Sequence, residues 1–208
     1  MMSRPPGRPK DAEKHRAIIT AAEEVFFDRG FAATTVAAVA ERAGVSKVTI
    51  YARFQDKAGL FEAMVKQVSD RMVAKCDVLP NTSAFLEERL VAFGMGLLSE
   101  LLSPRLIAFE RNLAGELSQH PALAKRFFEA GPLNDQRRLS IMIAEAAAKG
   151  DLDVTDPMHA AADLYGLWQG VHMIEVRFGI ANPPSQAKLG RIVKSGVARF
   201  LKAYRISN

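Results

Sequence analysis

The sequence TTVAAVAERAGVSKVTIYARFQDK at residues 34–57 predicts two short helices joined by a tight turn. Thr34 and Thr35 are favourable N-cap residues for the first helix. Its apolar residues recur at i, i+3, i+4 and i+7, as one helix face requires: Val36, Val39, Ala40 and Ala43. Gly44 can adopt the left-handed conformation that ends a helix, and Ser46 can cap a second helix running from Lys47 to about Arg53.

Two helices with a glycine-containing turn form a helix-turn-helix, in which the second helix enters the major groove of DNA. Four residues then face the DNA, offering one cation, hydroxyl groups and one phenol: Ser46, Lys47, Thr49 and Tyr51. Ile50 and Phe54 are left to pack inward. A short helix, a glycine turn and another helix also occur in helical proteins that bind no DNA, so the pattern alone leaves both interpretations open.

The wider pattern from about Arg16 to Val65 resembles the N-terminal DNA-binding domain of the TetR/AcrR family of bacterial transcriptional repressors. The resemblance rests on the AA..VF...GF lead-in, the TTV helix start, AGVSK.T.Y..F, and the K..L pair that opens the next helix. Val48 stands where the family often has Gly, and Ala52-Arg53 where it often has an aromatic residue or His. Val48 would bring a bulkier side chain to the DNA, so the base sequence that relatives read cannot be transferred to this chain.

The chain has 208 residues, of which 49% are hydrophobic and 25% charged, the composition of a soluble globular protein. Its net charge of +5 suits a nucleic-acid partner, although surplus cations are often only a solvated surface. Residues 1–10 predict a basic, flexible arm that could place Arg8 in the minor groove. Its Gly-Arg-Pro at residues 7–9 resembles an AT-hook, and a disordered solubilising tail is the equal alternative.

No apolar segment at the start has the length of a secretory signal. The longest fully apolar run, residues 90–98, is far below the ~18 residues of a membrane span. The single cysteine, Cys76, permits no internal disulfide and is expected to be a small buried hydrophobe. We therefore expect a cytoplasmic protein with no membrane partner.

The apolar pattern predicts a first helix over residues 11–29, stopped by Gly30, with a buried stripe of Ile18, Ala21, Ala22, Val25 and Phe26. Asp56 can cap a fourth helix that begins at Lys57. A helix N-terminus with Lys57 in its first turn favours a phosphate, and the family resemblance implies the same role. Lys57 is thus predicted to contact the DNA backbone.

Residues 80–83, Pro-Asn-Thr-Ser, interrupt the helical pattern and mark the best domain boundary. Helices are predicted beyond it at 85–102, 104–119, 122–149, 157–178 and 184–204, with Gly131-Pro132 kinking or splitting the third. The fold is predicted to be all-α, with a three-helix helix-turn-helix domain followed by an α-helical effector-binding and dimerisation domain. The expected divisions are an arm at 1–10, a DNA-binding domain at 11–57, a connecting helix at 58–79 and an effector domain at 80–208.

The family resemblance implies two further surfaces in the effector domain, and FERNLAGELSQHPALAKRFFEAGP at residues 109–132 is similar to the effector domains of one TetR/AcrR subgroup. The last two helices of TetR/AcrR subunits pair across a twofold axis, which assigns the dimer contact to Leu164, Val171, Ile192, Val193, Gly196, Val197 and Phe200. An effector pocket is implied among Phe93, Phe109, Leu113, Met142, Trp168 and His172. Each pocket residue could instead be ordinary core, and His172 a satisfied core or interface histidine.

Catalytic motifs are absent: there is no phosphate-binding glycine loop, no Gly-x-Ser-x-Gly and no His-Glu-x-x-His. We expect no catalytic residue, cofactor or metal. The hypothesis is a homodimeric repressor released from a palindromic operator by a small-molecule effector, with Lys47, Thr49 and Tyr51 reading bases and Thr34, Thr35, Ser46 and Lys57 anchoring. An architectural DNA-binding protein without sequence preference and an all-helical enzyme are the alternatives.

Overall fold

The computed structural model describes residues 8–74, 79–82 and 85–206, with backbone only for residues 8–10 and 73. It confirms the all-α prediction, since the only strand-like pairing in the described part is an isolated bridge between Leu152 and Arg205. The helices are α1 (Arg8–Ala33), α2 (Val36–Arg42), α3 (Lys47–Phe54), α4 (Lys57–Val73), α5 (Leu86–Leu101), α6 (Pro104–Gln119), α7 (Pro121–Ala130), α8 (Pro132–Ala148), α9 (Pro157–Arg177) and α10 (Gln186–Tyr204).

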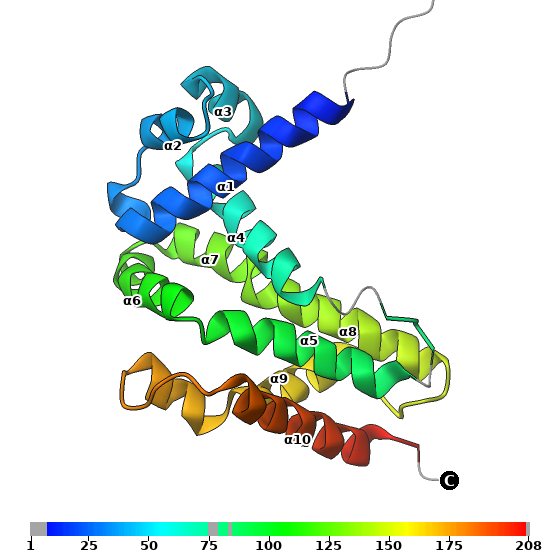
Figure 1. Cartoon of the computed structure of the whole chain (residues 1–208). Helices are drawn as coiled ribbons and strands as arrows, with labels where there is room; N and C mark the ends of the chain where they lie inside the picture. Colours follow the sequence, from blue (N-terminus) through cyan, green and yellow to red (C-terminus); the bar gives the residue numbers. More distant parts are fainter. Residues whose placement is uncertain (1–7, 75–78, 83–84, 207–208) are drawn as a thin grey trace, which may run out of the picture.

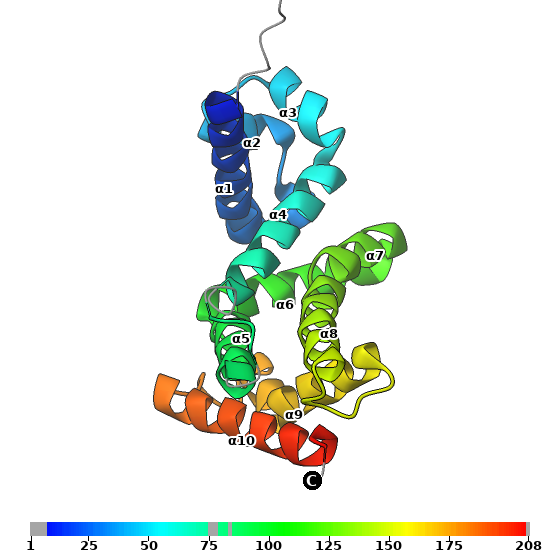
Figure 2. The ribbon, with the colours of Figure 1, turned by 90° about the vertical axis from the view of Figure 1, so that its right-hand side faces the viewer.

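We call α1 to α3 with the first turn of α4 the reading head, and α5 to α10 the effector domain. In Figure 1 the reading head lies at the top of the molecule and α4 descends from it into the effector domain. Figure 2 shows α5 and α8 below it, with α9 and α10 across the base. The last two helices therefore lie at the end of the molecule farthest from α3.

The helices of the reading head begin and end where short-range capping groups dictate. Thr35 Oγ1 accepts from the N–H of Ala38 (N to O, 3.1 Å), and Asp56 Oδ1 accepts from the N–H of Gly59 (2.6 Å). Gly44 has φ +65°, which permits the N–H of Val45 to reach the carbonyl of Ala40 at 3.0 Å. This is the six-to-one bond of a Schellman motif, and it sets the turn between α2 and α3.

The core of the reading head confirms the predicted stripe on α1, all of which is buried. Phe26 meets Phe61 of α4 edge to face, with ring centroids 5.2 Å apart, and Ile50 of α3 is fully buried beside them. The boundaries of α1 differ from the prediction because the helix begins at Arg8 and resumes for one turn after a non-helical Gly30 (φ +76°). Gly30 thus breaks the helix where expected, without ending it.

Two glycine positions shape the effector domain. Gly131 (φ −105°, ψ −96°) lies outside the helical region, and Pro132 opens α8 at a position where its missing N–H costs nothing. The predicted 122–149 helix is therefore split into α7 and α8, not kinked. Gly170 (φ +47°) breaks α9, which no sequence pattern indicated.

No single helix among the described residues is both long enough and apolar enough to span a membrane. The pair α5 and α6 meets the requirement only when taken together, and the two are bent by 64° at their junction.

Candidate nucleic-acid interface and effector cavity

The exposed face of α3 is anchored by two buried side chains on its opposite face. Ile50 and Phe54 are buried, which turns Lys47 and Tyr51 outward; the tyrosine is 49% exposed. Val48 is 76% exposed beside them, as its replacement of glycine predicted. Lys47 makes no hydrogen bond or ion pair with any described residue, so its ammonium is available to a ligand.

Ser46 and Thr49 lie at the N-terminus of α3, and their hydroxyls contact each other. Ser46 Oγ accepts from the N–H of Thr49 at 3.2 Å and lies 2.9 Å from Thr49 Oγ1. Ser46 is exposed and Thr49 only half-buried, at a helix start whose first N–H groups have no helical acceptor. The predicted residues Ser46, Lys47, Val48, Thr49 and Tyr51 are therefore brought onto one end of one helix.

Thr34 is a correction to the predicted DNA contacts. Its side chain is 1% exposed, and Oγ1 donates to the carbonyl of Gly30 at 2.6 Å. The hydroxyl thus satisfies a carbonyl left open by the break in α1, and it is sealed from a DNA surface. Its neighbour Thr35 is exposed and caps α2, so only the second threonine of the pair can face DNA.

Lys57 has a different environment from the one predicted. Its Nζ donates to the carbonyl oxygens of Phe31 (2.8 Å), Thr34 (3.0 Å) and Ala32 (3.2 Å). It also lies 4.3 Å from the centroid of the Phe31 ring, a cation–π distance. All three ammonium donors are therefore used inside the chain, because the end of α1 leaves carbonyls without helical partners.

Arg53 and Arg8 are two further cations of the reading head. Arg53 forms an ion pair with Asp11 of α1, which holds the pKa of that carboxyl below its ordinary value through the hydrogen bond and the nearby charge. Arg53 thus binds α3 to α1. Arg8 opens α1 and its side chain lies outside the described atoms, as do residues 1–7 of the predicted arm and Cys76.

Aromatic and ionic contacts join the reading head to the effector domain. Phe27 of α1 stacks on Phe109 of α6 with centroids 4.3 Å apart. Glu116 Oε2 accepts from the N–H of Ala32 at 2.9 Å, and the buried Glu23 receives Arg71 at 3.0 Å and Arg105 at 3.1 Å. α6 is therefore in direct contact with α1.

A narrow apolar cavity of about 50 Å³ lies at this junction. Its walls come from both parts of the molecule, including Phe27 of α1 and Met64 of α4. The complete lining is Phe27, Met64, Val65, Val68, Ser69, Met72, Leu101, Leu106, Phe109, Glu110, Phe127, Gly131, Pro132, Asp135 and Tyr165. Apolar walls with a few converging polar groups are the usual composition of a small-molecule site.

Of the predicted pocket residues, only Phe109 lines this cavity. Phe93 and Trp168 stack on each other with centroids 6.2 Å apart, and Trp168 Nε1 donates to the carbonyl of Val193 at 3.3 Å. They fill the space between α5, α9 and α10. Leu113 and Met142 are buried elsewhere in the core, and His172, whose pKa burial lowers, lies beside Gly170.

The polar groups of the cavity were not among the predicted pocket residues, because they lie on four different helices, α4, α6, α8 and α9. Asp135 could have indicated a polar group in the core, since this acidic residue lies on the same apolar face of α8 as Leu139, Met142 and Ile143. It is 3% exposed, and burial raises its pKa to about 6, while Ser69 and Arg138 act in the opposite direction. Burial also raises the pKa of Glu110.

The predicted dimer residues are mostly inside their own subunit. Leu164, Val193, Gly196, Val197 and Phe200 are buried because the apolar face of α10 packs against α5 and α9. Gly196 permits close approach as predicted, but its neighbour is Trp168, which would lie 2.7 Å from an added Cβ. Ile192 is half-buried and Val171 is 71% exposed, so Val171 alone of the set is fully available to a partner.

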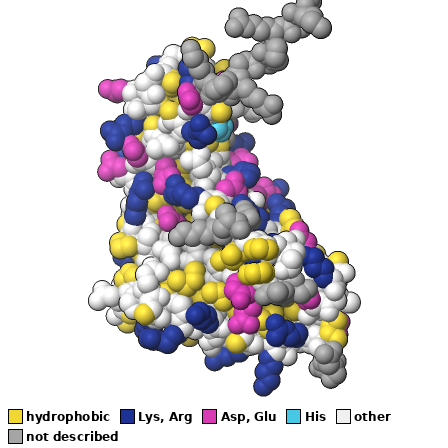
Figure 3. Space-filling model, turned by 45° about the vertical axis from the view of Figure 1, so that its right-hand side comes forward, with side chains coloured by type: hydrophobic (Ala, Val, Ile, Leu, Met, Phe, Trp, Pro, Cys, Tyr) yellow, Lys and Arg dark blue, Asp and Glu magenta, His cyan; other side chains and the backbone are white. Residues whose placement is uncertain are grey.

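An exposed apolar surface does exist near that position, at the C-terminal end of α9. Val171, Ile174 and Phe178 are all exposed and recur at i, i+3 and i+7, so they share one helix face, followed by the exposed Ile180. Such exposed stripes mark interaction sites. Figure 3 shows one face of the molecule, where hydrophobic side chains gather in the lower, effector part below mixed charges around the reading head.

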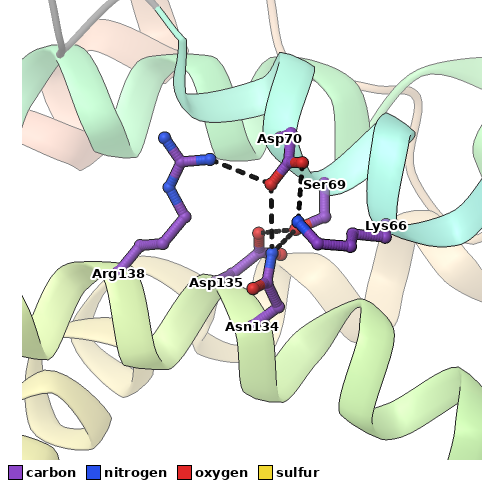
Figure 4. A network of polar contacts seen from close by, with 6 residues as sticks. All are labelled: Lys66, Ser69, Asp70, Asn134, Asp135 and Arg138. Carbon is purple, nitrogen blue, oxygen red and sulfur yellow. Dashed lines mark hydrogen bonds and ion pairs between the residues drawn. The ribbon is translucent and has the colours of Figure 1, made fainter. Parts of the chain in front are cut away.

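Within the described residues, no group of three or more His, Cys, Asp or Glu side chains could hold a metal ion. Several of the charged clusters contain ion pairs that join two helices. One of them, shown in Figure 4, joins α4 to α8 through Asp70, which accepts from Arg138 Nη1 at 3.0 Å and Lys66 Nζ at 2.8 Å.

Comparison with known proteins gives matches to both parts of the chain. Residues 18–64 match the family model of bacterial regulatory proteins of the tetR family. Residues 88–206 match the C-terminal domain of AefR-like transcriptional repressors. Among curated proteins, the HTH-type transcriptional regulator YdeS of Bacillus subtilis is 42% identical over 67 residues, 32% of this chain and 34% of YdeS. That match therefore spans about a third of either protein.

Solved structures match over nearly the full length. A TetR-family transcriptional regulator from Mesorhizobium loti is 28% identical with a TM-score of 0.76, covering 96% of this chain and 100% of that protein. The flavonoid-responsive regulator FrrA is 33% identical with a TM-score of 0.67, covering 95% of this chain and 100% of that one.

Proposed function

Because the chain belongs to the TetR family of bacterial transcriptional regulators, we propose that it is a homodimeric repressor released from a palindromic operator by a small-molecule effector. Family membership also confirms that the chain is a regulator and not an enzyme. One observation carries the proposal: side chains of α1 and α4, which support the recognition helix, also line the effector cavity. A regulator of this kind acts on DNA in the cytoplasm.

The proposed DNA contact is the outer end of α3 in the major groove. Lys47 and Tyr51 extend from it, Val48 offers an apolar contact to a thymine methyl group, and Thr49 offers a hydroxyl. Thr35 and Ser46, at the starts of α2 and α3, suit phosphate oxygens through hydroxyl and amide groups. Arg8 remains the candidate minor-groove contact from the arm, and Lys57 acts inside the chain.

The twofold contact is proposed at the exposed stripe Val171, Ile174 and Phe178, with the outer surface of α10 beside it. These residues would be covered by the same residues of a second copy, as an isologous interface requires. Because α9 and α10 lie opposite the reading head, pairing through them leaves both α3 helices free (Figure 1). A palindrome with half-sites ~34 Å apart, or a multiple, would then suit the dimer.

The switch is proposed to act through the connecting helix α4, between a DNA-binding domain at 11–57 and an effector domain at 80–208. The cavity is about 50 Å³, below the several hundred Å³ of typical ligand sites, so a larger effector must separate α4 from α7 and α8. Displacing Met64 and Phe27 would shift both reading heads. The effector lowers operator affinity by its preference for the expanded state.

The proposal is tested by selecting bound sites from random duplex DNA with the full-length protein, where we expect a palindrome. On the selected site, Lys47→Ala or Tyr51→Ala should weaken binding by about 10- to 100-fold, with little loss on random DNA. Lys125→Ala is the matched control, since it removes one exposed cation from α7, outside the proposed DNA and dimer contacts. Binding without any enriched motif, or equal losses on both DNAs, would instead favour an architectural DNA-binding protein.

A further inference from the structure

The charge on the wall of the effector cavity is of one sign. Its lining includes two carboxyl groups, Asp135 and Glu110, and no Lys, Arg or His. Ser69 and Tyr165 supply hydroxyls, and the remaining walls are aliphatic, aromatic or sulfur-containing. An anionic ligand would therefore meet two acids and no countercharge, which is costly at low dielectric.

Asp135 is buried without a cation in direct contact among the described residues. Its Oδ1 accepts a hydrogen bond from Ser69 Oγ at 2.5 Å. The nearest guanidinium, on Arg138, is bound to Asp70 of α4 and points away from Asp135 in Figure 4. One hydroxyl donor leaves most of the hydrogen-bonding capacity of a carboxylate unused.

Glu110 and Tyr165 are the other polar residues of the cavity. Glu110 has an ion-pair partner, whereas the Tyr165 hydroxyl has no hydrogen-bond partner in the described residues. Glu110 Oε2 lies 3.2 Å from Arg177 Nη2, so its charge is already balanced. The pKa of Tyr165 is raised by burial and then by the charges of Asp135 and Glu110, which lie near it. The uncompensated charge of the cavity thus belongs to Asp135.

We propose that the effector is a lipophilic organic cation, an aromatic or aliphatic amine whose ammonium pairs with Asp135 while its apolar body lies among Phe27, Met64 and Phe109. This proposal rests on the proposed function, since it names the ligand class of the same switch. An ammonium supplies the missing countercharge and a hydrogen-bond donor, and the Tyr165 hydroxyl can accept a second N–H. A neutral ligand of the same shape leaves the buried charge as it is.

The titration of Asp135 agrees with this geometry. Burial raises its pKa to about 6, which leaves the carboxyl mostly ionised at neutral pH at a cost to the unliganded protein. A bound ammonium would supply the countercharge that the buried Asp135 carboxylate lacks. Part of the binding free energy would therefore come from this ion pair. Affinity for a cation should consequently depend on the ionisation of this group.

The test uses three probes with one aromatic skeleton and different charge: 1-naphthylmethylamine, 1-naphthylmethanol and 1-naphthoic acid. Binding to the full-length protein is measured by calorimetry at pH 7.5. We expect the amine to bind about 10-fold more tightly than the alcohol, and the acid most weakly, as charge-assisted pairing implies. Asp135→Asn should abolish the preference for the amine. Glu129→Gln is the charge-matched control, because it removes a solvated carboxylate from α7 and should leave the preference intact.

A second measurement needs no variant. Between pH 7.5 and 5 the amine stays cationic while Asp135 becomes protonated, so its affinity should fall about 10-fold and that of the alcohol should not. The other charged or titratable groups around Asp135 are Asp70 on α4, Glu110 on α6, Arg138 on α8, and Tyr165 and Arg177 on α9. Of these, only Glu110 is a second carboxyl with a raised pKa, and the Asp135→Asn profile isolates its contribution.

An amine that binds no more tightly than the alcohol, including no binding by either, overturns the cation proposal. Tighter binding of the alcohol would assign the cavity to neutral hydroxylated aromatics, the class to which flavonoids belong, and tighter binding of the acid to anions. Operator binding without ligand is measured separately. Its presence keeps the repressor proposal when the cation proposal fails, and its absence defeats the repressor proposal whatever the probes do.

Discussion

In the reading head the buried hydroxyl of Thr34 donates to a carbonyl group, and Lys57 donates to three. In the effector domain, by contrast, buried polar atoms of Arg89, His172 and Arg177 lack a partner, and the Asp135 carboxylate lacks a countercharge. None of the buried side-chain atoms without a partner in the described residues comes from the reading head. Among the described residues, the buried polar side chains of the reading head are thus paired, whereas the effector domain retains uncompensated ones.

The difference agrees with the two tasks of the proposed function. Reading DNA requires side chains held in one geometry, and paired polar groups around a packed core provide that. Sensing a ligand would require two states of similar free energy, and the Asp135 carboxylate, which lines the cavity without a countercharge, raises the free energy of the empty state. The exposed surfaces also differ, since the outer end of α3 presents mainly polar side chains around Val48, whereas the C-terminal end of α9 presents an apolar stripe. Four substitutions test this comparison.

The largest effect is expected at the exposed apolar stripe of α9. Ile174→Asp should weaken the dimer more than about 100-fold, because a twofold interface would bury the new charge twice. Sedimentation velocity over a concentration series measures it. Ile141→Asp, the same change at a similarly exposed isoleucine of α8, is the control and should leave the dimer unchanged. If both variants behave alike, the stripe is not the dimer contact.

Removing the buried charge of the effector domain should stabilise the protein. The pKa of Asp135 is raised from its ordinary 3.8 to about 6, so the folded state binds the proton more tightly than the unfolded chain. Wild-type stability should therefore fall as pH rises through the two pKa values, by about 3 kcal/mol in total from well below 3.8 to well above 6.

Asp135→Asn imitates the protonated state, so it should be about 3 kcal/mol more stable than wild type at pH 7.5 and equal near pH 4. Urea unfolding at both pH values measures this difference. A variant that is less stable at pH 7.5 would mean that the carboxylate holds α4 to α8 through Ser69, and that the effector domain is as fully paired as the reading head.

In the reading head, removing a half-buried charged group should lower the free energy of unfolding, not raise it. Lys57→Met leaves three carbonyl groups without their donor and should cost about 2 kcal/mol of unfolding free energy. Thermal or urea unfolding measures it, and Lys125→Met, at an exposed lysine of α7, is the control. Unchanged stability combined with weaker binding to all DNA would return Lys57 to the phosphate contact predicted from the sequence.

The smallest effect is expected for Thr34→Val, which keeps the side-chain shape and removes the donor to Gly30. We expect a loss of about 1 kcal/mol in stability, with operator affinity nearly unchanged when measured well below the melting temperature. The control is Thr155→Val, at an exposed threonine. A clear loss of operator affinity at full folding would show that Thr34 reaches DNA.

Sequence reasoning succeeded where structure depends on neighbours along the chain. Thr35, Ser46 and Asp56 cap helices as predicted, and Gly44 makes the turn between α2 and α3. The outward face of α3 followed from the same spacing, because Ile50 and Phe54 could be recognised as the inward face. These signals act within about four residues, so they are visible in a single sequence.

The helices of the effector domain were predicted from the sequence, but the packing partners of their apolar faces were not. An apolar stripe shows which face of a helix avoids water without showing what covers that face. Phe200 and Val193 meet their own subunit, Val171 is left exposed, and Phe109 faces a cavity, yet all of them carry the same signal. The internal acceptors of Lys57 were missed for a related reason, since they lie 23 to 26 residues away along the chain.

The sequence by itself determined that this chain is all-α, that it carries a helix-turn-helix, and which side chains α3 presents. Only the tertiary structure decided that Lys57 and Thr34 support the head from inside, and that α9, not α10, offers an apolar surface. It also decided that a carboxylate faces a cavity between α4 and α8. The physical reason is distance along the chain, because packing joins Ser69 to Asp135 across 66 residues, whereas caps and turns join near neighbours.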